Sequence, residues 1–262
     1  MVNISIGQYF PGDSALHKLD PRAKLMFTCL MIAAIFLAKT AWGYAALFAF
    51  TVYMAAISRI SIKIIMRALV PIRLILIMTF VLNVFFSPGG DELARWQFVV
   101  ITAGGLRTAV FFTMRLLLLV ISAQMMTLTT SPIALTDGIE QLLRPLGRIG
   151  FPAHELAMMM SIALRFIPLL MEEADKIRKA QMARGADFET GNLIRRAKAM
   201  IPLLVPLFVS AFRRADELAL AMEARCYRSG AHRTRMKALK FSVLDACGAV
   251  LIAGLILLVI II

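Results

Sequence analysis

Two arginines, each at the end of a charged, alanine-rich stretch, are the residues whose types and spacing suggest a specific interaction. The stretches read ADKIRKAQMARG (Ala174 to Gly185) and ADELALAMEARC (Ala215 to Cys226). Both follow the pattern A-D-x-x-x-x-A-x-x-A-R plus a small residue, and they align without a gap. A guanidinium group is planar, always charged and carries five donors, which suits docking onto carboxylates or backbone carbonyls. The repeat therefore indicates a docking site for another protein.

Within each copy, two alanines and the arginine share one face of a helix, because they lie at i, i+3 and i+4. Such alanines let two helix backbones approach closely, so we expect Ala180 and Ala221 to lie where the two helices cross. An ordinary C-terminal cap also explains a single copy, but two copies at a fixed offset favour docking. The predicted docking residues are Ala183, Arg184 and Gly185 in the first copy and Ala224, Arg225 and Cys226 in the second.

The other candidate residues do not suggest catalysis or a metal site. The chain has no G-x-x-x-x-G-K-[ST] sequence, so it does not bind ATP phosphates by that route itself. HELAM (His154 to Met158) resembles a zinc-protease helix, but methionine stands where the second histidine is needed. The three cysteines show no paired spacing. We therefore expect no catalytic residue, metal or cofactor in this chain.

The composition is that of an integral membrane protein. Of the 262 residues, 60% are hydrophobic and only 17% are charged, and the mean hydropathy is +0.79. A soluble domain of this length cannot bury so much apolar surface in one core. The net charge of +13 raises the possibility of nucleic-acid binding, but the cations crowd into particular loops, as membrane topology predicts.

Apolar runs predict about five membrane-spanning helices in an all-α fold. The first two runs are short and are separated by Lys39-Thr40, which favours a tight hairpin of two spans. The long polar region between the fourth and fifth runs lies outside the membrane in this interpretation. The predicted spans are Leu25 to Ala38, Ala41 to Ile57, Leu69 to Phe86, Gly104 to Thr127 and Phe241 to Ile262.

Lysine and arginine are distributed unequally between the two sides of this topology. The proposed inner side carries 25 of them and the outer side only Lys39 and Arg95, while Arg107 and Arg115 lie within the fourth span. Positively charged loops stay in the cytoplasm. The protein is therefore predicted to be multi-pass in the cell membrane, with its N-terminus cytoplasmic and its C-terminus external.

The region between the fourth and fifth spans is predicted to hold two long helices, 153–184 and 193–225, joined at Gly191-Asn192. Each begins with an apolar half and ends in one copy of the repeated motif. Pro168, Pro202 and Pro206 are expected to kink these helices or divide them. The predicted organisation is residues 1–127 with the first four spans, 128–240 with the cytoplasmic coupling helices, and 241–262 with the last span.

Taken together, these motifs resemble the T component, the transmembrane coupling subunit, of energy-coupling factor (ECF) transporters, which import vitamins and other micronutrients. The two Ala-Arg-small motifs carry the resemblance most strongly. GQYFPGDSALHKLDPRAKL (Gly7 to Leu25), ALRFIPLL (Ala163 to Leu170) and IPLLVPL (Ile201 to Leu207) also look like the family. The likeness covers essentially the whole chain. The second motif of the family usually ends in Gly or Ser, where this chain has Cys226.

The resemblance implies that Arg184 and Arg225 each insert into a groove of one of two ATPase subunits, which bind ATP and Mg²⁺. It also implies a separate substrate-binding membrane subunit packed against this chain. A dedicated cobalt or nickel transport subunit is an alternative within the family. A stand-alone secondary transporter or channel, and an intramembrane enzyme, are alternatives outside it, but neither explains the repeated motif.

Overall fold

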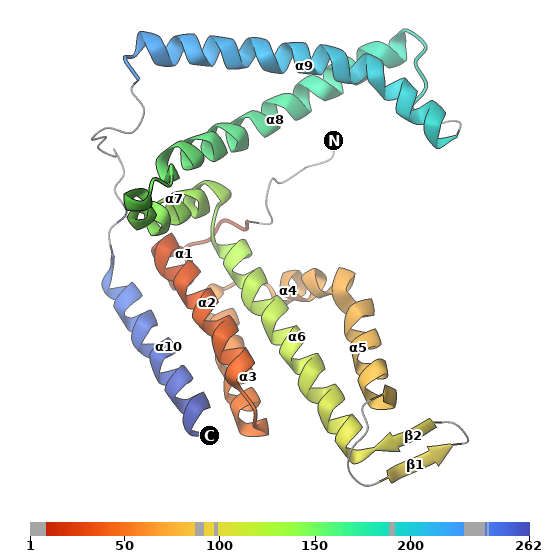
Figure 1. Cartoon of the computed structure of the whole chain (residues 1–262), viewed down its shortest axis with the longest axis vertical. Helices are drawn as coiled ribbons and strands as arrows, with labels where there is room; N and C mark the ends of the chain where they lie inside the picture. The colour runs from red at the N-terminus through yellow and green to blue at the C-terminus, as the bar shows by residue number, and fades with distance from the viewer. Residues whose placement is uncertain (1–8, 87–91, 97–98, 189–191, 228–238, 240) are drawn as a thin grey trace. The chain divides into compact units, whose positions relative to one another are not determined.

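The computed structural model describes residues 9–86, 92–96, 99–188, 192–227, 239 and 241–262. The regular structure of these residues is helical apart from one two-stranded β-hairpin (Figure 1). The elements are α1 Ala15–Lys18, α2 Pro21–Leu37, α3 Ala41–Ser58, α4 Ile62–Leu69, the 3₁₀ helix η1 Val70–Ile72, α5 Arg73–Phe86, β1 Glu92–Trp96, β2 Val99–Thr102, α6 Ala103–Thr129, α7 Pro132–Leu143, the 3₁₀ helix η2 Arg144–Ile149, α8 Ala153–Ala183, α9 Leu193–Ala224 and α10 Val243–Ile261.

The chain divides into two compact units, Met1–Gly138 with Lys237–Ile262, and Ile139–Met236. The first unit, here called the membrane unit, holds α1 to α6 and α10, and the second, the coupling unit, holds α8 and α9. The boundary falls inside α7, somewhat later than the end of the first predicted region at residue 127. The start of α7 belongs with α2, since a Cβ added at Gly138 would lie 3.1 Å from Cβ of Pro21.

Among the described residues, five helical stretches are long and apolar enough to cross a membrane, which confirms the predicted class of all-α integral membrane protein. They differ from the predicted set in two places. The helix α8, predicted to lie outside the membrane, meets the criterion of length and hydropathy, whereas α2, predicted to span, has only 17 residues. The five are Ala41–Ser58, Ile62–Phe86, Ala103–Thr129, Ala153–Ala183 and Val243–Ile261.

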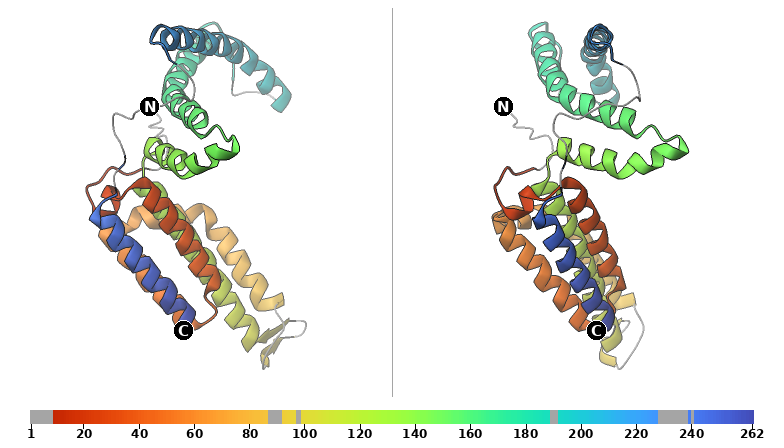
Figure 2. Two further views of the ribbon diagram at one scale, coloured as in Figure 1. Left: turned by 60° about the vertical axis from the view of Figure 1, so that its left-hand side comes forward. Right: turned by 90° about the vertical axis from the view of Figure 1, so that its left-hand side faces the viewer.

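The core of the membrane unit lies between α2, α3, α6 and α10, which pack side by side (Figures 1 and 2). The predicted hairpin of two short helices is confirmed, because α2 ends at Leu37 and α3 begins at Ala41. The hydroxyl of Thr40 caps α3 by accepting a hydrogen bond from the N–H of Gly43 (3.2 Å). The buried core residues are Met31, Ala34, Ile35, Ala38, Tyr44, Leu47, Leu118, Leu255 and Val259.

The third predicted span is not one helix. The chain first forms the amphipathic α4, then a 3₁₀ turn around Pro71, and only then α5, which has 14 residues. Proline removes a backbone donor and clashes with the preceding turn, which explains the break. After α5, β1 begins at Glu92 and pairs antiparallel with β2; residues 87–91 lie outside the described residues.

A buried polar cluster joins the starts of α2 and α10. Asp20 caps α2 by accepting from the N–H of Arg22 (2.9 Å), as the sequence Asp-Pro-Arg predicts. The carboxylate of Asp245 accepts from the N–H of Asp20 (2.9 Å) and from the N–H of Ser242 (2.6 Å). Ser242 and Asp245 form a capping box at the start of α10. One carboxylate therefore stabilises two helix starts that are 225 residues apart in sequence.

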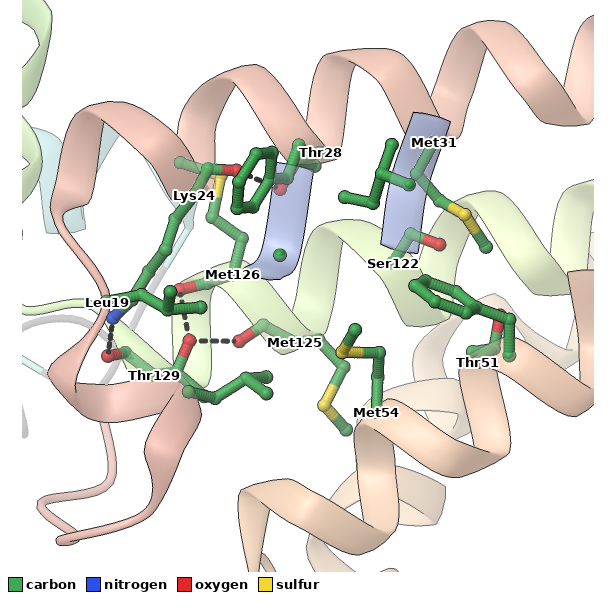
Figure 3. Close-up of a pocket in the computed structure, with 15 residues that line it drawn as sticks. Leu19, Lys24, Thr28, Met31, Thr51, Met54, Ser122, Met125, Met126 and Thr129 are labelled. Carbon is green, nitrogen blue, oxygen red and sulfur yellow. Dashed lines mark hydrogen bonds between the residues drawn. The ribbon is translucent and has the colours of Figure 1, made fainter. Parts of the chain in front are cut away.

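Lys24 links the same cluster to the end of α6. Its ammonium group donates to the carbonyl of Thr129 (2.8 Å), the hydroxyl of Thr130 (3.3 Å) and the carbonyl of His17 (3.3 Å). Figure 3 shows the Lys24 side chain turned toward Thr129. Because a lysine ammonium has three donors, these bonds use its full donor capacity.

These contacts place four helix ends at one end of the membrane unit. The starts of α2 and α10 meet through Asp20 and Asp245, and the end of α6 meets them through Lys24. The end of α3 lies there too, because Ile60 packs with Leu128. The segment between α6 and α10 therefore leaves the membrane unit and returns to it at the same end.

A small cavity of about 110 Å³ lies between α2, α3, α6 and α10, beside the Lys24 contacts (Figure 3). Its walls are mainly apolar and include Met31, Met54, Met125 and Met126. The hydroxyl of Ser122 in this wall is buried and has no hydrogen-bond partner among the described residues. The cavity is therefore a mainly apolar space in which Ser122 carries an unpartnered hydroxyl.

We expect Asp245→Ala to lower the free energy of unfolding by about 3 kcal/mol, because the buried N–H of Asp20 and the partly buried N–H of Ser242 lose a charged acceptor. The measurement is thermal unfolding of the detergent-solubilised protein, followed by circular dichroism. Asp13→Ala is the control, because Asp13 is exposed. Equal melting temperatures for the two variants would contradict a stabilising role for Asp245.

Candidate docking site

The first copy of the motif forms the C-terminal cap of α8. Arg184 is the cap residue and Gly185, with φ +86°, adopts the left-handed conformation. The N–H of Gly185 donates to the carbonyl of Met182 (3.0 Å), and the N–H of Ala186 donates to the carbonyl of Gln181 (3.0 Å). This pair of bonds satisfies two of the carbonyls that a helix end leaves free.

The second copy forms the same cap on α9. Arg225 is the cap residue and Cys226 is left-handed, with φ +54°. The N–H of Cys226 donates to the carbonyl of Glu223 (2.8 Å), and the N–H of Tyr227 donates to the carbonyl of Met222 (3.0 Å). Each hydrogen bond of the first copy thus has its counterpart at the equivalent position of the second.

The shared cap explains the small third residue of the motif. Gly185 and Cys226 both occupy the left-handed position, which glycine adopts freely and residues with a Cβ adopt at a cost. A Cβ at Gly185 would meet nothing within 4 Å, so backbone strain alone favours glycine there. In physical terms, Ala-Arg-small is a last helical residue, a cap residue and a left-handed residue that turns the chain away.

Both caps leave their arginines available. Arg184 and Arg225 are exposed, and within the described part of the chain neither makes an ion pair or a side-chain hydrogen bond. By contrast, Arg178 of the same helix as Arg184 pairs with Asp175 at 3.2 Å, the local pair expected at i, i+3. The two guanidinium groups at the helix ends therefore retain all their donors for a partner.

The alanine faces are also open in the coupling unit. Ala180 and Ala183 on α8 are exposed, as are Ala221 and Ala224 on α9. The contact that the structure describes between α8 and α9 is made elsewhere, so a crossing through Ala180 and Ala221 is not part of it. The reason is that the two helices run in opposite directions, which carries the two motifs to opposite ends of the pair (Figure 1).

The contact between α8 and α9 joins equivalent positions of the repeat. A guanidinium nitrogen of Arg214 lies 3.5 Å from a carboxylate oxygen of Glu173, and each of these residues immediately precedes the first alanine of its motif copy. When two antiparallel helices contact each other through equivalent positions of a repeat, a local pseudo-twofold axis relates them. In the sequence, the opposite charges of Glu173 and Arg214 at the same repeat position are the signal for this contact.

The pseudo-twofold arrangement sets the spacing of the two arginines. Arg184 follows Glu173 along α8 by the same number of positions as Arg225 follows Arg214 along α9. At 1.5 Å per helical residue this stretch, roughly three turns, is about 16 Å long on each side, so the arginines are separated by up to about 33 Å.

The prolines do not interrupt this spacing. Pro168, Pro202 and Pro206 were expected to kink or divide the helices; α8 and α9 are each continuous through their prolines, so neither is divided, and α9 bends along its length (Figure 1). The coupling unit therefore presents two matched cationic ends on continuous helices.

His154, weighed as a metal ligand in the sequence, lies at the start of α8. Its Nδ1 is 3.0 Å from a carboxylate oxygen of Glu140. Among the described residues, no three His, Cys, Asp or Glu side chains lie together as metal ligands would. The contact of His154 with Glu140 thus joins the end of α7 to the start of α8.

Comparisons with known proteins agree on one family. Residues 12–236 match the model of the CbiQ family, described as cobalt transport protein. The chain is similar to the energy-coupling factor transporter transmembrane protein EcfT of Brevibacillus brevis, with 53% identity over 259 residues, covering 99% of this chain and 97% of the relative. It is also similar to the proteins of the same name from Thermosediminibacter oceani (54% identity; 94% and 92% coverage) and Bacillus subtilis (47% identity; 94% and 92% coverage).

The left-handed caps can be tested by exchanging the third motif residues. We expect Gly185→Ala to destabilise the protein by about 1 kcal/mol, because alanine in the left-handed region is strained. Cys226→Gly removes a backbone strain of about 1–2 kcal/mol, but glycine costs roughly 0.5–1 kcal/mol more in chain entropy on folding. We therefore expect a gain in the free energy of unfolding of up to about 1.5 kcal/mol.

The measurement is thermal unfolding of both variants beside the unmodified protein. The signs are expected to be opposite, with Gly185→Ala below and Cys226→Gly at or above the reference melting temperature. A gain from Gly185→Ala would show that residue 185 is not left-handed in the folded protein.

Proposed function

The chain belongs to the family of energy-coupling factor transporter transmembrane proteins, and from this membership we propose that it is the coupling subunit of an ATP-driven micronutrient importer. It is a transporter membrane component, and its own part in transport is mechanical. Two ATPase subunits bind and hydrolyse ATP with Mg²⁺, and this chain transmits their motion. A separate substrate-binding membrane subunit receives that motion and carries the substrate.

One observation carries the proposal: two helix ends with identical caps present unpaired, exposed arginines in a pseudo-twofold arrangement. ATPase subunits that form a dimer offer two equivalent grooves related by twofold symmetry. A partner of that symmetry binds Arg184 and Arg225 in two equivalent grooves. A single arginine would not require a symmetric partner. The exposed alanines beside each arginine allow close approach of the groove walls.

The substrate class we propose is a vitamin, following the resemblance to the ECF T component. The description of the matching family as cobalt transport protein favours one alternative, a cobalt or nickel transport subunit. The two differ in the substrate-binding partner. Purification of the complex from native membranes, with each copurifying subunit identified by mass, distinguishes them: vitamin-binding subunits support the first, and a cobalt- or nickel-binding subunit the second.

The orientation we propose places the coupling unit in the cytoplasm and the C-terminus outside the cell. The segment between Thr130 and Phe241 leaves and returns at one end of the membrane unit, and 18 lysines and arginines lie in residues 144–240. Positive segments stay on the cytoplasmic side. A reporter fused after Ile262 is expected to be active only as an enzyme that works outside the cytoplasm, such as alkaline phosphatase. Activity of a cytoplasmic reporter at the same place would contradict this orientation.

The docking role is tested by reversing both arginine charges. We expect Arg184→Glu with Arg225→Glu to leave the protein inserted in the membrane but to abolish assembly with the ATPase subunits and ATP-driven uptake. Each single variant is expected to retain part of both, because one contact remains. The measurements are copurification of the ATPase subunits and uptake by proteoliposomes.

The matched control is Arg178→Glu, an exposed arginine of α8 that lies before the cap and pairs with Asp175. It changes the charge by the same amount as each single variant without touching a helix end. Full assembly of the double variant with the ATPase subunits would contradict the docking role. An equal loss of assembly in Arg178→Glu would contradict it too.

A further inference from the structure

An arginine near the middle of α6 pairs with no carboxylate among the residues that the structure describes. Arg115 lies about midway between Ala103 and Thr129, the first and last residues of that helix. The sequence has no Asp or Glu between Asp20 and Asp91, and none between Glu92 and Asp137. Helices α2 to α6 therefore carry no acid, and an ionised group within a membrane helix requires a partner.

The side chain of Arg115 is held in place by Tyr44 and by aromatic rings. Its Nε donates to the hydroxyl of Tyr44 (2.9 Å), which is the single side-chain hydrogen bond that the described residues give it. The guanidinium carbon lies 5.4 Å from the ring centre of Phe112, 5.6 Å from that of Phe36 and 5.9 Å from that of Tyr44. The planar group is oriented, while the N–H groups of its two terminal nitrogens still need an acceptor.

The neighbours of Arg115 place it near one membrane surface. Phe36 is the last residue but one of α2, and Tyr44 is the fourth residue of α3, so Arg115 lies close to the turn that carries Lys39. Helices α2 and α3, at 1.5 Å per residue, are about 26 and 27 Å long, close to the ~30 Å hydrocarbon core. Trp42, 77% exposed, lies beside the same turn, as tryptophans of an interfacial belt do.

We propose that Arg115 binds the phosphate of a membrane phospholipid at the level of the α2–α3 turn. The two terminal nitrogens donate two parallel hydrogen bonds to phosphate oxygens, the geometry for which the guanidinium fork is suited. The acyl chains lie on the exposed rings of Phe36 and Phe112, which flank the arginine. Headgroup phosphates are present at this depth around the whole protein, whereas a carboxylate of a partner protein would have to be supplied at one position.

The test measures retention of phospholipid by the full-length protein. The protein is purified in detergent, incubated with dioleoyl phosphatidylglycerol or with a phosphate-free galactosyl diacylglycerol, and bound lipid is counted by native mass spectrometry. We expect selective retention of the phospholipid and a loss of affinity of about tenfold or more in Arg115→Gln. Arg107→Gln is the matched control, because Arg107 is exposed and lies about two turns away on the same face of α6.

Two further variants keep the test decisive if Arg115→Gln folds poorly. Arg115→Lys keeps the charge without the planar fork, and Tyr44→Phe removes only the hydrogen bond that orients it; both are expected to weaken retention by several-fold. Unchanged phospholipid retention in the Arg115 variants would overturn the proposal, as would equal retention of the galactolipid by the unmodified protein. Loss of a copurifying membrane subunit, with phospholipid retention unchanged, would assign the arginine to a partner's carboxylate instead.

Discussion

The hydrogen bonds of one buried carboxylate, that of Asp245, determine how the two ends of the chain are arranged. Asp245 accepts from the backbone of Asp20 and caps α10, so α2 and α10 begin at the same end of the membrane unit. Lys24 adds the end of α6 to that end. A backbone donor buried without an acceptor is costly in a low-dielectric surrounding, which makes these contacts selective as well as stabilising. The end of α6 and the start of α10 therefore lie at the same end of the membrane unit.

The two docking ends depend on a different and purely local constraint. A helix end leaves carbonyls unsatisfied, and a left-handed residue after the cap lets the next two N–H groups bond to them. The motif meets this requirement twice, and the arginine is the residue at which the helix stops. A side chain at that position extends from a rigid end while its backbone is already satisfied. Backbone strain at the left-handed residue is greater in the second copy, because Cys226 has a Cβ and Gly185 has none.

Local features of the fold could be predicted from the sequence, because they depend on neighbours in the chain. The short hairpin at Lys39-Thr40, the cap at Asp20 and the repeated motif are all of this kind. Apolar runs of sufficient length likewise predicted α6 and α10 closely.

The break at Pro71 was missed, because hydropathy averages over a turn that one proline interrupts. Contacts between residues far apart in the sequence were also missed. The capping box of Ser242 and Asp245 is a local signal, but nothing in the sequence shows that Asp245 also binds the backbone of Asp20. The repeat was visible, yet similarity of two helices does not reveal whether they run parallel or antiparallel, and that choice decides which repeat positions meet.

The antiparallel arrangement has a mechanical consequence for coupling by a symmetric ATPase pair. If the two ends are gripped and moved toward each other, equal forces act at equal distances, about 16 Å, from the Glu173–Arg214 contact. Because α8 and α9 cross at an angle (Figure 1), such forces have a component that turns the helices about their contact. The ion pair at this contact is partly exposed, so it contributes little stability and costs little to rearrange. In the coupling role that we propose, the continuous helices on either side act as levers that carry this rotation along the coupling unit.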